Sequence, residues 1–121
     1  MKKVLIVDDA KLMRNIIKDI LSGDQRYIFF ESENGKDAIE CYKNHQPDLV
    51  TMDMTMEHEN GLDVTRDILS YDQHAKIIIV TSLGQEKLIK DCIEAGVKDF
   101  VIKPFSKNRM LEAVTKALQL N

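Results

Sequence analysis

The sequence has no excess of positive charge, and its apolar runs are short. Its 17 basic residues are outnumbered by 20 acidic ones, so no overall positive field favours binding to nucleic acid or to an anionic membrane. The apolar run at residues 4–7 is followed by Asp8 and Asp9, which leaves it too short for a signal-peptide core or a membrane span. We therefore expect a cytoplasmic protein that binds neither nucleic acid nor membrane.

Cysteine and proline are also scarce. Cys41 and Cys92 lie far apart without metal-site spacing, and each falls in a segment with helical periodicity, so a disulfide framework is not indicated. No segment is rich in Pro or in Gly and Ser, as a linker would be. Apolar residues make up 44% of the chain and charged residues 31%, a balance typical of a globular protein. We expect residues 1–121 to form a single domain.

The chain alternates short apolar runs with segments of helical periodicity. Continuous apolar or β-branched runs, which predict strands covered on both faces, lie at residues 4–7, 27–30, 49–52, 77–80 and 100–102. The clearest helical spacing is that of Leu12, Met13, Ile16, Ile17, Ile20 and Leu21. Gly35, Gly61 and Gly96 lie where strands or helices are expected to end. The alternation predicts an α/β fold, a three-layer sandwich around a mostly parallel sheet.

Polar residues follow the predicted strands at the ends where ligands bind in such a fold. Asp8 and Asp9 follow the first strand, Asp53 the third, Thr81 the fourth and Lys103 the fifth. Three carboxylates in one crevice repel one another, so they would take up protons or bind a hard divalent cation such as Mg²⁺. The sequence therefore predicts a magnesium site at this edge of the sheet.

Helix capping is an alternative explanation for Asp8 and Asp9, because aspartate is favoured at helix N-termini. Capping does not explain Asp53, which ends a buried strand where an unpaired charge is costly. Lys103 could neutralise Asp53 or bind a phosphoryl oxygen, while the Thr81 hydroxyl donates to another oxygen. Lys103 precedes Pro104, so the peptide bond between them could be cis or trans.

Four motifs together resemble the response-regulator receiver family. They are an acidic pair after VLIV, the aspartate of VTMDMTM, a Thr-Ser pair after IIIV and a Lys-Pro pair after DFVI. The resemblance covers essentially the whole chain, and DDAKLMR, VTMDMTM and KDFVIKPF resemble single-domain chemotaxis receivers in particular. It implies a flavodoxin-like (βα)5 fold with strand order 2-1-3-4-5.

The resemblance also implies the chemistry of the site. Asp53 is the expected phosphoacceptor, and Mg²⁺ is expected on Asp8, Asp9, Asp53 and the backbone carbonyl of Thr55. A histidine kinase is the expected source of the phosphoryl group. A carboxylate nucleophile needs no general base, so positioning and charge neutralisation by Mg²⁺ and Lys103 are expected to supply most of the catalysis.

The resemblance assigns Thr81 and Phe100 as a switch pair, with Phe100 standing where chemotaxis receivers usually have tyrosine. The ring is expected to turn inward as Thr81 moves towards the phosphoryl group. Without the resemblance, Phe100 would simply be a core residue of the fifth strand. The expected readout surface is the fourth helix, fifth strand and fifth helix. Lys87, Lys90 and Lys107 are candidates to line it, although each alone is better explained as a solvated charge.

The expected function is therefore that of a monomeric signalling switch rather than an enzyme acting on other substrates. Our first interpretation of its output is chemotaxis control through a flagellar motor switch protein, or through another output protein. The alternative is a phosphorelay intermediate that passes its phosphoryl group to a histidine phosphotransfer protein. A phosphatase that removes the phosphoryl group is a further candidate partner.

Two residues depart from the family pattern in the loop after Asp53. Glu57 stands where proline is usual, and Asn60 stands where aspartate usually precedes the glycine, so we expect a less rigid and more acidic loop. In the family the positions of Thr55 and Leu83 tune hydrolysis of the phosphoryl group.

The sequence fits two other protein classes less well than the receiver family. A haloacid-dehalogenase-like phosphatase requires a second aspartate two residues after its nucleophile, where this chain has Thr55. A flavodoxin binds phosphate in the loop after its first strand, where Asp8 and Asp9 would repel an anion.

Overall fold

The computed structural model describes residues 1–23 and 26–119, and its main sheet has five parallel strands. The strands of this sheet are β1 (Lys2–Val7), β2 (Tyr27–Ser32), β3 (Leu49–Asp53), β6 (Ile77–Thr81) and β7 (Asp99–Ile102). A small second sheet pairs β4 (Thr55–Met56) with β5 (Glu59–Asn60). The helices are α1 (Lys11–Leu21), α2 (Gly35–His45), α3 (Gly61–Tyr71), α4 (Glu86–Ala95) and α5 (Lys107–Leu118).

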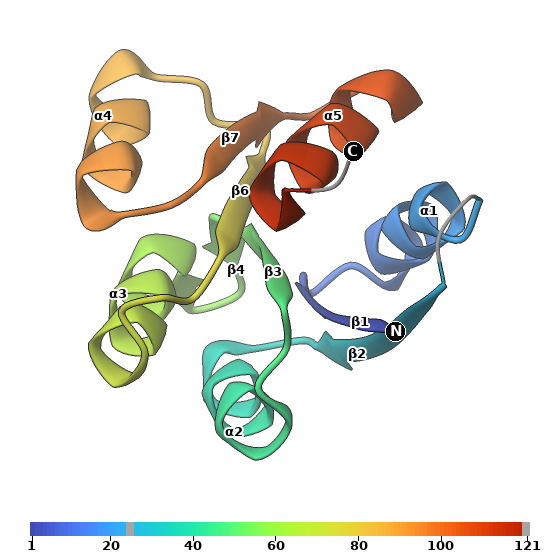
Figure 1. Ribbon diagram of the computed structural model, residues 1–121. Coiled ribbons are helices and arrows are strands. Elements are labelled where there is room, and N and C mark those ends of the chain that lie inside the picture. The colour runs from blue at the N-terminus through green and yellow to red at the C-terminus, as the bar shows by residue number, and fades with distance from the viewer. Residues whose placement is uncertain (24–25, 120–121) are drawn as a thin grey trace.

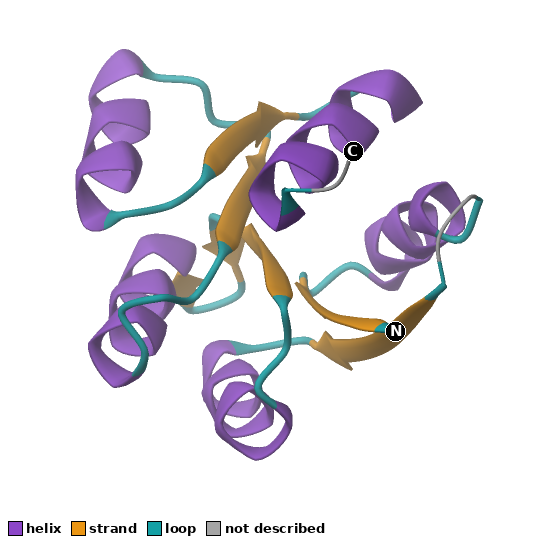
Figure 2. Ribbon diagram, in the orientation of Figure 1, coloured by secondary structure: helices purple, strands orange, loops and turns teal. Residues whose placement is uncertain are grey.

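The main sheet has the strand order β2-β1-β3-β6-β7. Because β4 and β5 lie outside this sheet, the order is that of a flavodoxin-like 2-1-3-4-5 fold, which confirms the prediction. Helices cover both faces of the sheet, α1 and α5 on one and α2, α3 and α4 on the other (Figures 1 and 2). Each face has its own apolar cluster, so the molecule has three layers.

Burial follows the position of each strand in the sheet. Every residue of the central strands β3 and β6 is buried, as their continuous apolar runs predicted. The prediction of burial on both faces is wrong for residues 27–30, since β2 is an edge strand and Ile28 is 41% exposed. The helix predicted by the spacing of residues 12–21 is confirmed as α1, in which Leu12 is nevertheless 73% exposed.

Two glycines that were expected to end elements instead begin helices. Gly35 is the first residue of α2 and Gly61 the first of α3, each preceded by an asparagine whose side chain caps the helix. A Cβ on Gly61 would collide with the backbone oxygen of Asp53, so the chain needs glycine there. Gly96 does end α4, with the left-handed φ of 111° that favours glycine.

In the part of the chain that the structure describes, no helix combines the length and the apolar character needed to cross a membrane.

Candidate metal and phosphoryl site

Three aspartates meet where β1 and β3 end. Asp8 and Asp9 directly follow β1, Asp53 is the last residue of the neighbouring strand β3, and one carboxylate oxygen from each lies within 4.8 Å of the others. Asp8 is 2% exposed and Asp53 6%, whereas Asp9 is exposed to solvent. The parallel register places these carboxylates together, as the order of elements predicted.

Lys103 supplies a positive charge to this cluster. Its Nζ lies 3.0 Å from Oδ2 of Asp8 and 3.5 Å from Oδ1 of Asp53. Its backbone N–H donates to the carbonyl of Thr81 at 2.8 Å, which joins the ends of β6 and β7. The Lys103–Pro104 peptide bond is cis. The prediction that the ammonium group reaches the crevice is therefore confirmed.

The electrostatics of the cluster leave Asp53 poorly compensated. Burial raises its pKa above the usual range and repulsion from Asp8 adds to this effect, while Lys103 and a hydrogen bond from the Thr55 N–H oppose it. Three carboxylates against one ammonium group leave the crevice negative. An all-oxygen donor set of this charge fits a hard divalent cation such as Mg²⁺.

Hydrogen bonds orient the first two aspartates. Oδ1 of Asp8 accepts the N–H of Ala10 at 2.9 Å, and Oδ2 of Asp9 accepts the N–H of Glu57 at 3.0 Å. The N-cap residue of α1 is Ala10, which makes no side-chain cap hydrogen bond of its own. Asp8 thus satisfies one N–H at the start of α1, but neither aspartate is the N-cap residue, so capping does not account for the pair.

The segment after Asp53 forms a β-hairpin that the sequence analysis did not predict. Thr55 pairs with Asn60 and Met56 with Glu59, and the turn between them contains His58 with a left-handed φ of 61°. The Thr55 N–H donates to Oδ1 of Asp53 at 3.3 Å, so the hairpin begins at the cluster. The carbonyl of Thr55 as a metal ligand stays a prediction.

Asn60 has a clear local role despite its departure from the family pattern. Its Oδ1 accepts the N–H of Leu62 at 2.8 Å and so caps α3. The backbone N–H of Gly61, the residue after Asn60, donates to the carbonyl of Met54 at 2.8 Å. The exit of the hairpin is thus attached both to α3 and to the residue after Asp53.

The predicted switch residues lie on the adjacent strands β6 and β7. Thr81 is fully buried, and its Oγ1 accepts the N–H of Leu83 at 3.2 Å. Phe100 is 8% exposed and belongs to the apolar cluster against which Leu88 and Ile89 of α4 pack. A core position for this ring agrees with both interpretations of Phe100, and its switching role stays a prediction.

Sequence reasoning missed Arg14, which supports the backbone at Asp8. Its Nη1 donates to the carbonyl of Asp8 at 2.8 Å, and its Nε donates to Glu31 at 2.9 Å. Arg14 is 6% exposed and lies on the buried side of α1 with Ile17 and Leu21. The spacing of these three positions was the available signal, since they recur as i, i+3 and i+7.

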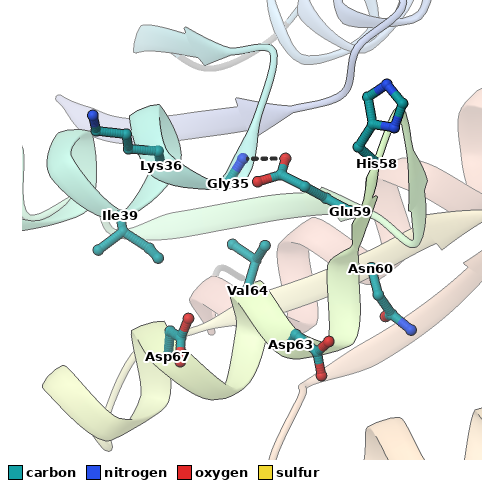
Figure 3. A pocket seen from close by; sticks show the side chains of 9 residues that line it. All are labelled: Gly35, Lys36, Ile39, His58, Glu59, Asn60, Asp63, Val64 and Asp67. Carbon is teal, nitrogen blue, oxygen red and sulfur yellow. Dashed lines mark hydrogen bonds between the residues drawn. The ribbon is translucent and has the colours of Figure 1, made fainter.

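Glu59 was also missed. Its Oε2 accepts the N–H of Gly35 at 2.6 Å and so connects the hairpin to the first residue of α2 (Figure 3). No local pattern in the sequence marks this bond, because its two partners are 24 residues apart.

Comparisons with known proteins agree with this geometry. The family model described as the response regulator receiver domain matches residues 4–115. The chain is 47% identical over 116 residues to the chemotaxis protein CheY of Bacillus subtilis, with 96% of this chain and 97% of that protein covered. Its identity to the chemotaxis protein CheY of Thermotoga maritima is 45% over 115 residues, with 95% and 96% covered.

Solved structures give the same result. The CheX-CheY-BeF3-Mg complex from Borrelia burgdorferi contains a chain with 34% identity and a TM-score of 0.88, with 95% of this chain and 87% of that chain covered. The response regulator domain of Thermotoga maritima CheB has 27% identity and a TM-score of 0.88, with 100% and 98% covered. The chain therefore belongs to the response regulator receiver domain family.

Proposed function

We propose that this chain is a single-domain response regulator that is phosphorylated on Asp53 by a histidine kinase in a Mg²⁺-dependent reaction. The observation that carries the proposal is the meeting of Asp8, Asp9 and Asp53 within 4.8 Å beside the Lys103 ammonium group. Such a constellation at a sheet edge combines a nucleophile, a cation site and a fixed positive charge. The protein acts as a switch, and the only reactions it catalyses are its own phosphorylation and dephosphorylation.

In this proposal, a carboxylate oxygen of Asp53 attacks the phosphorus atom of the donor. A new O–P bond forms while the bond from phosphorus to the leaving group breaks, and the leaving group departs with the electron pair. Lys103 stays within reach of the transferred oxygens and offsets their charge. Asp53 needs no general base, because its reactive form is the ionised carboxylate.

Asp8, Asp9, Asp53 and the carbonyl of Thr55 are the proposed ligands of Mg²⁺. Bound there, the cation would lower the repulsion between Asp53 and the incoming phosphoryl oxygens. The raised pKa of Asp53 supports this assignment, because a group whose charge is poorly compensated gains most from a nearby cation. The relative from Borrelia burgdorferi is itself a complex with Mg and BeF3.

For the output we propose chemotaxis control through a flagellar motor switch protein or another output protein. The support is that the chain spans nearly the whole length of two chemotaxis proteins to which it is 45% and 47% identical. The proposed readout surface comprises α4, β7 and α5, which are neighbours in the fold (Figure 1). Leu83, Ile93 and Ile102 expose 37%, 51% and 40% of their surface in this region and offer apolar contacts.

The lysines of this surface are expected to contribute less to partner binding than these apolar side chains. Lys87 and Lys90 each lie near an acidic residue one turn along α4, at 3.6 Å from Asp91 and 3.9 Å from Glu94. Both lysine side chains are largely exposed, so these pairs are solvated charges of little energetic value.

We further propose that the protein works in the cytoplasm as a monomer and transmits its signal through contacts with partner proteins.

Intact mass spectrometry after incubation with acetyl phosphate tests the phosphorylation proposal. We expect one phosphoryl adduct on the wild type with Mg²⁺ present, and none with EDTA or with Asp53→Asn. The adduct should disappear on standing, because an acyl phosphate hydrolyses. An adduct that forms without Mg²⁺, or that persists on Asp53→Asn, would reject the assignment.

A further inference from the structure

We propose that Glu59 is a positioning residue which fastens the loop after Asp53 to α2 and thereby holds the cation site in its binding geometry. Its carboxylate accepts the N–H of Gly35 at 2.6 Å. This inference rests on the proposed function, since it concerns the same cation site. It assigns a role to a side chain that none of the steps described above uses.

The contact uses the start of a helix. Gly35 is the first residue of α2, where backbone N–H groups lack partners within the helix. The Asn34 side chain already caps the N–H of Asp37 at 2.9 Å. Glu59 therefore satisfies a second N–H of the same helix end, from an element that is distant in sequence.

Gly35 also makes the approach possible. A Cβ at this position would lie 2.8 Å from Oε1 of Glu59 and 2.6 Å from Cγ2 of Val64. A side chain at position 35 would therefore have to displace the Glu59 carboxylate or the Val64 side chain. The absence of a side chain at position 35 and the carboxylate at position 59 are thus complementary parts of one contact.

The hydrogen bond is the specific link between α2 and the hairpin at this point. A pocket of about 260 Å³ lies beside it between α2 and α3, with Ile39 and Val64 among the lining residues (Figure 3). Because this space borders Glu59, the hairpin is not packed continuously against α2 on that side. The direction of the hairpin depends correspondingly more on the bond to Gly35.

The hairpin in turn touches the aspartate cluster at two points. Glu59 pairs with Met56 across the hairpin, and the neighbouring residues of that strand and turn contact the site. The Glu57 N–H donates to Asp9 at 3.0 Å, and the Thr55 N–H donates to Asp53 at 3.3 Å. Release of Glu59 would let these donors, and the Thr55 carbonyl, move away from the carboxylates.

The test compares Glu59→Ala with Glu59→Gln, which keeps an acceptor oxygen but removes the charge. Mg²⁺ affinity is measured by isothermal titration calorimetry, and exchange of the Gly35 amide hydrogen is measured by NMR without Mg²⁺. We expect Glu59→Ala to weaken Mg²⁺ binding about tenfold, the lower end of the range for groups that orient metal ligands. It should also speed exchange at Gly35, while Glu59→Gln stays near wild type in both measurements.

Asn34→Ala is the matched control, because it removes a cap from the same end of α2 and leaves the Glu59 contact in place. Gly35→Ala tests the contact from the other side and should reproduce the loss of Mg²⁺ affinity, even if Glu59→Ala fails to fold. Unchanged Mg²⁺ affinity in Glu59→Ala or in Gly35→Ala would overturn the proposal. A loss of Mg²⁺ affinity in Asn34→Ala equal to that in Glu59→Ala would also overturn the proposal, because it would indicate fraying of α2 as the cause. An equal loss in Glu59→Gln would overturn it by indicating that the charge of Glu59, and not its hydrogen bond, is the cause.

Phosphorylation is measured separately on the same proteins with acetyl phosphate. A wild type that binds Mg²⁺ but is not phosphorylated would reject the proposed function and leave the positioning role to be judged on Mg²⁺ affinity alone. A phosphorylated wild type whose Glu59→Ala variant binds Mg²⁺ normally would reject the positioning role alone.

Discussion

At the scale of single residues, Asp53 carries a charge that the folded protein disfavours. Burial and repulsion from Asp8 raise its pKa. A carboxyl group whose pKa is higher in the folded than in the unfolded state contributes most stability at low pH, and this contribution is lost as pH rises through the folded pKa. The proposed phosphoacceptor is therefore a source of instability at neutral pH.

We predict that Asp53→Asn without Mg²⁺ is more stable than the wild type near neutral pH. The difference should narrow towards acidic pH, where the wild-type carboxyl group takes up its proton. Urea unfolding followed by circular dichroism at several pH values measures this, with the exposed Asp67→Asn as a control. A variant less stable than the wild type at neutral pH would contradict this account of Asp53.

The positive charge of Lys103 offsets the negative charges of the carboxylates of Asp8 and Asp53. Because its Nζ lies 3.0 Å from Asp8 and 3.5 Å from Asp53, it competes with a cation for these carboxylates. We predict that Lys103→Ala binds Mg²⁺ at least as tightly as the wild type but loses the response of partner binding to phosphorylation. The proposed contact of Lys103 with the phosphoryl group would be a charge-assisted hydrogen bond of about 2 kcal/mol.

Titration calorimetry with Mg²⁺, and with an output protein before and after phosphorylation, tests Lys103→Ala. Weaker Mg²⁺ binding in the variant would show that Lys103 supports the cation site instead of opposing it.

The sequence was most informative for residues whose place follows from the order of strands. Asp8, Asp53 and Lys103 each follow or end a strand, so parallel pairing alone brings them to one edge. Arg14 and Glu59 could not be found in this way, because their roles depend on the direction of a side chain and on partners distant in sequence.

At the scale of elements, the hairpin after Asp53 depends on its junction with α3. Asn60 caps this helix through the N–H of Leu62 at 2.8 Å. We predict that Asn60→Ala lowers the free energy of unfolding by about 1 kcal/mol, the usual value of an N-cap, whereas Asn60→Asp leaves it nearly unchanged. Urea unfolding measures this free energy for both variants. An equal decrease in Asn60→Ala and Asn60→Asp would show that the amide group has a role beyond capping.

The same hairpin shows why local patterns were insufficient. Its strands have two residues each, too few to show alternation, and His58 occupies a left-handed conformation that usually signals glycine or asparagine. The edge position of β2 was likewise hidden, because Tyr27 to Phe30 are apolar in sequence although the strand is only partly covered.

The proposed switch connects two neighbouring strands, with Thr81 ending β6 and Phe100 lying in β7. We predict that Thr81→Ala weakens transmission of the signal more than Mg²⁺ binding, because the proposed partner of the hydroxyl is the phosphoryl group and not the cation. The expected loss for one hydrogen bond is about 1 kcal/mol, or about fivefold in partner affinity. Thr81→Ser keeps the hydroxyl and serves as the control.

NMR spectra with Mg²⁺ and beryllium fluoride, a stable phosphoryl mimic, test the switch without a partner. The chemical-shift changes that beryllium fluoride induces at Phe100 and in α4 should be smaller in Thr81→Ala and should persist in Thr81→Ser. Equal loss of Mg²⁺ affinity and of these shifts would place Thr81 in the cation site instead.

At the scale of the whole molecule, the alternation of strands and helices predicted a three-layer α/β sandwich, and the family resemblance implied the order of its strands. Right-handed crossovers between parallel strands leave few arrangements, and the observed order is the flavodoxin-like one. The site then follows from the topology, because the carboxyl ends of neighbouring strands share one edge. Side-chain contacts across the layers, such as Glu59 with Gly35, required the structure.

The proposed switch depends on the attachment of a phosphoryl group to one carboxylate among three that lie within 4.8 Å. The most direct measurement is reduction of the acyl phosphate with borohydride after incubation with acetyl phosphate and Mg²⁺, followed by peptide mass mapping. We predict homoserine at position 53 and unmodified aspartate at positions 8 and 9. Homoserine at position 8 or 9, or no homoserine in a protein that binds Mg²⁺, would contradict the assignment of Asp53 as the phosphoacceptor.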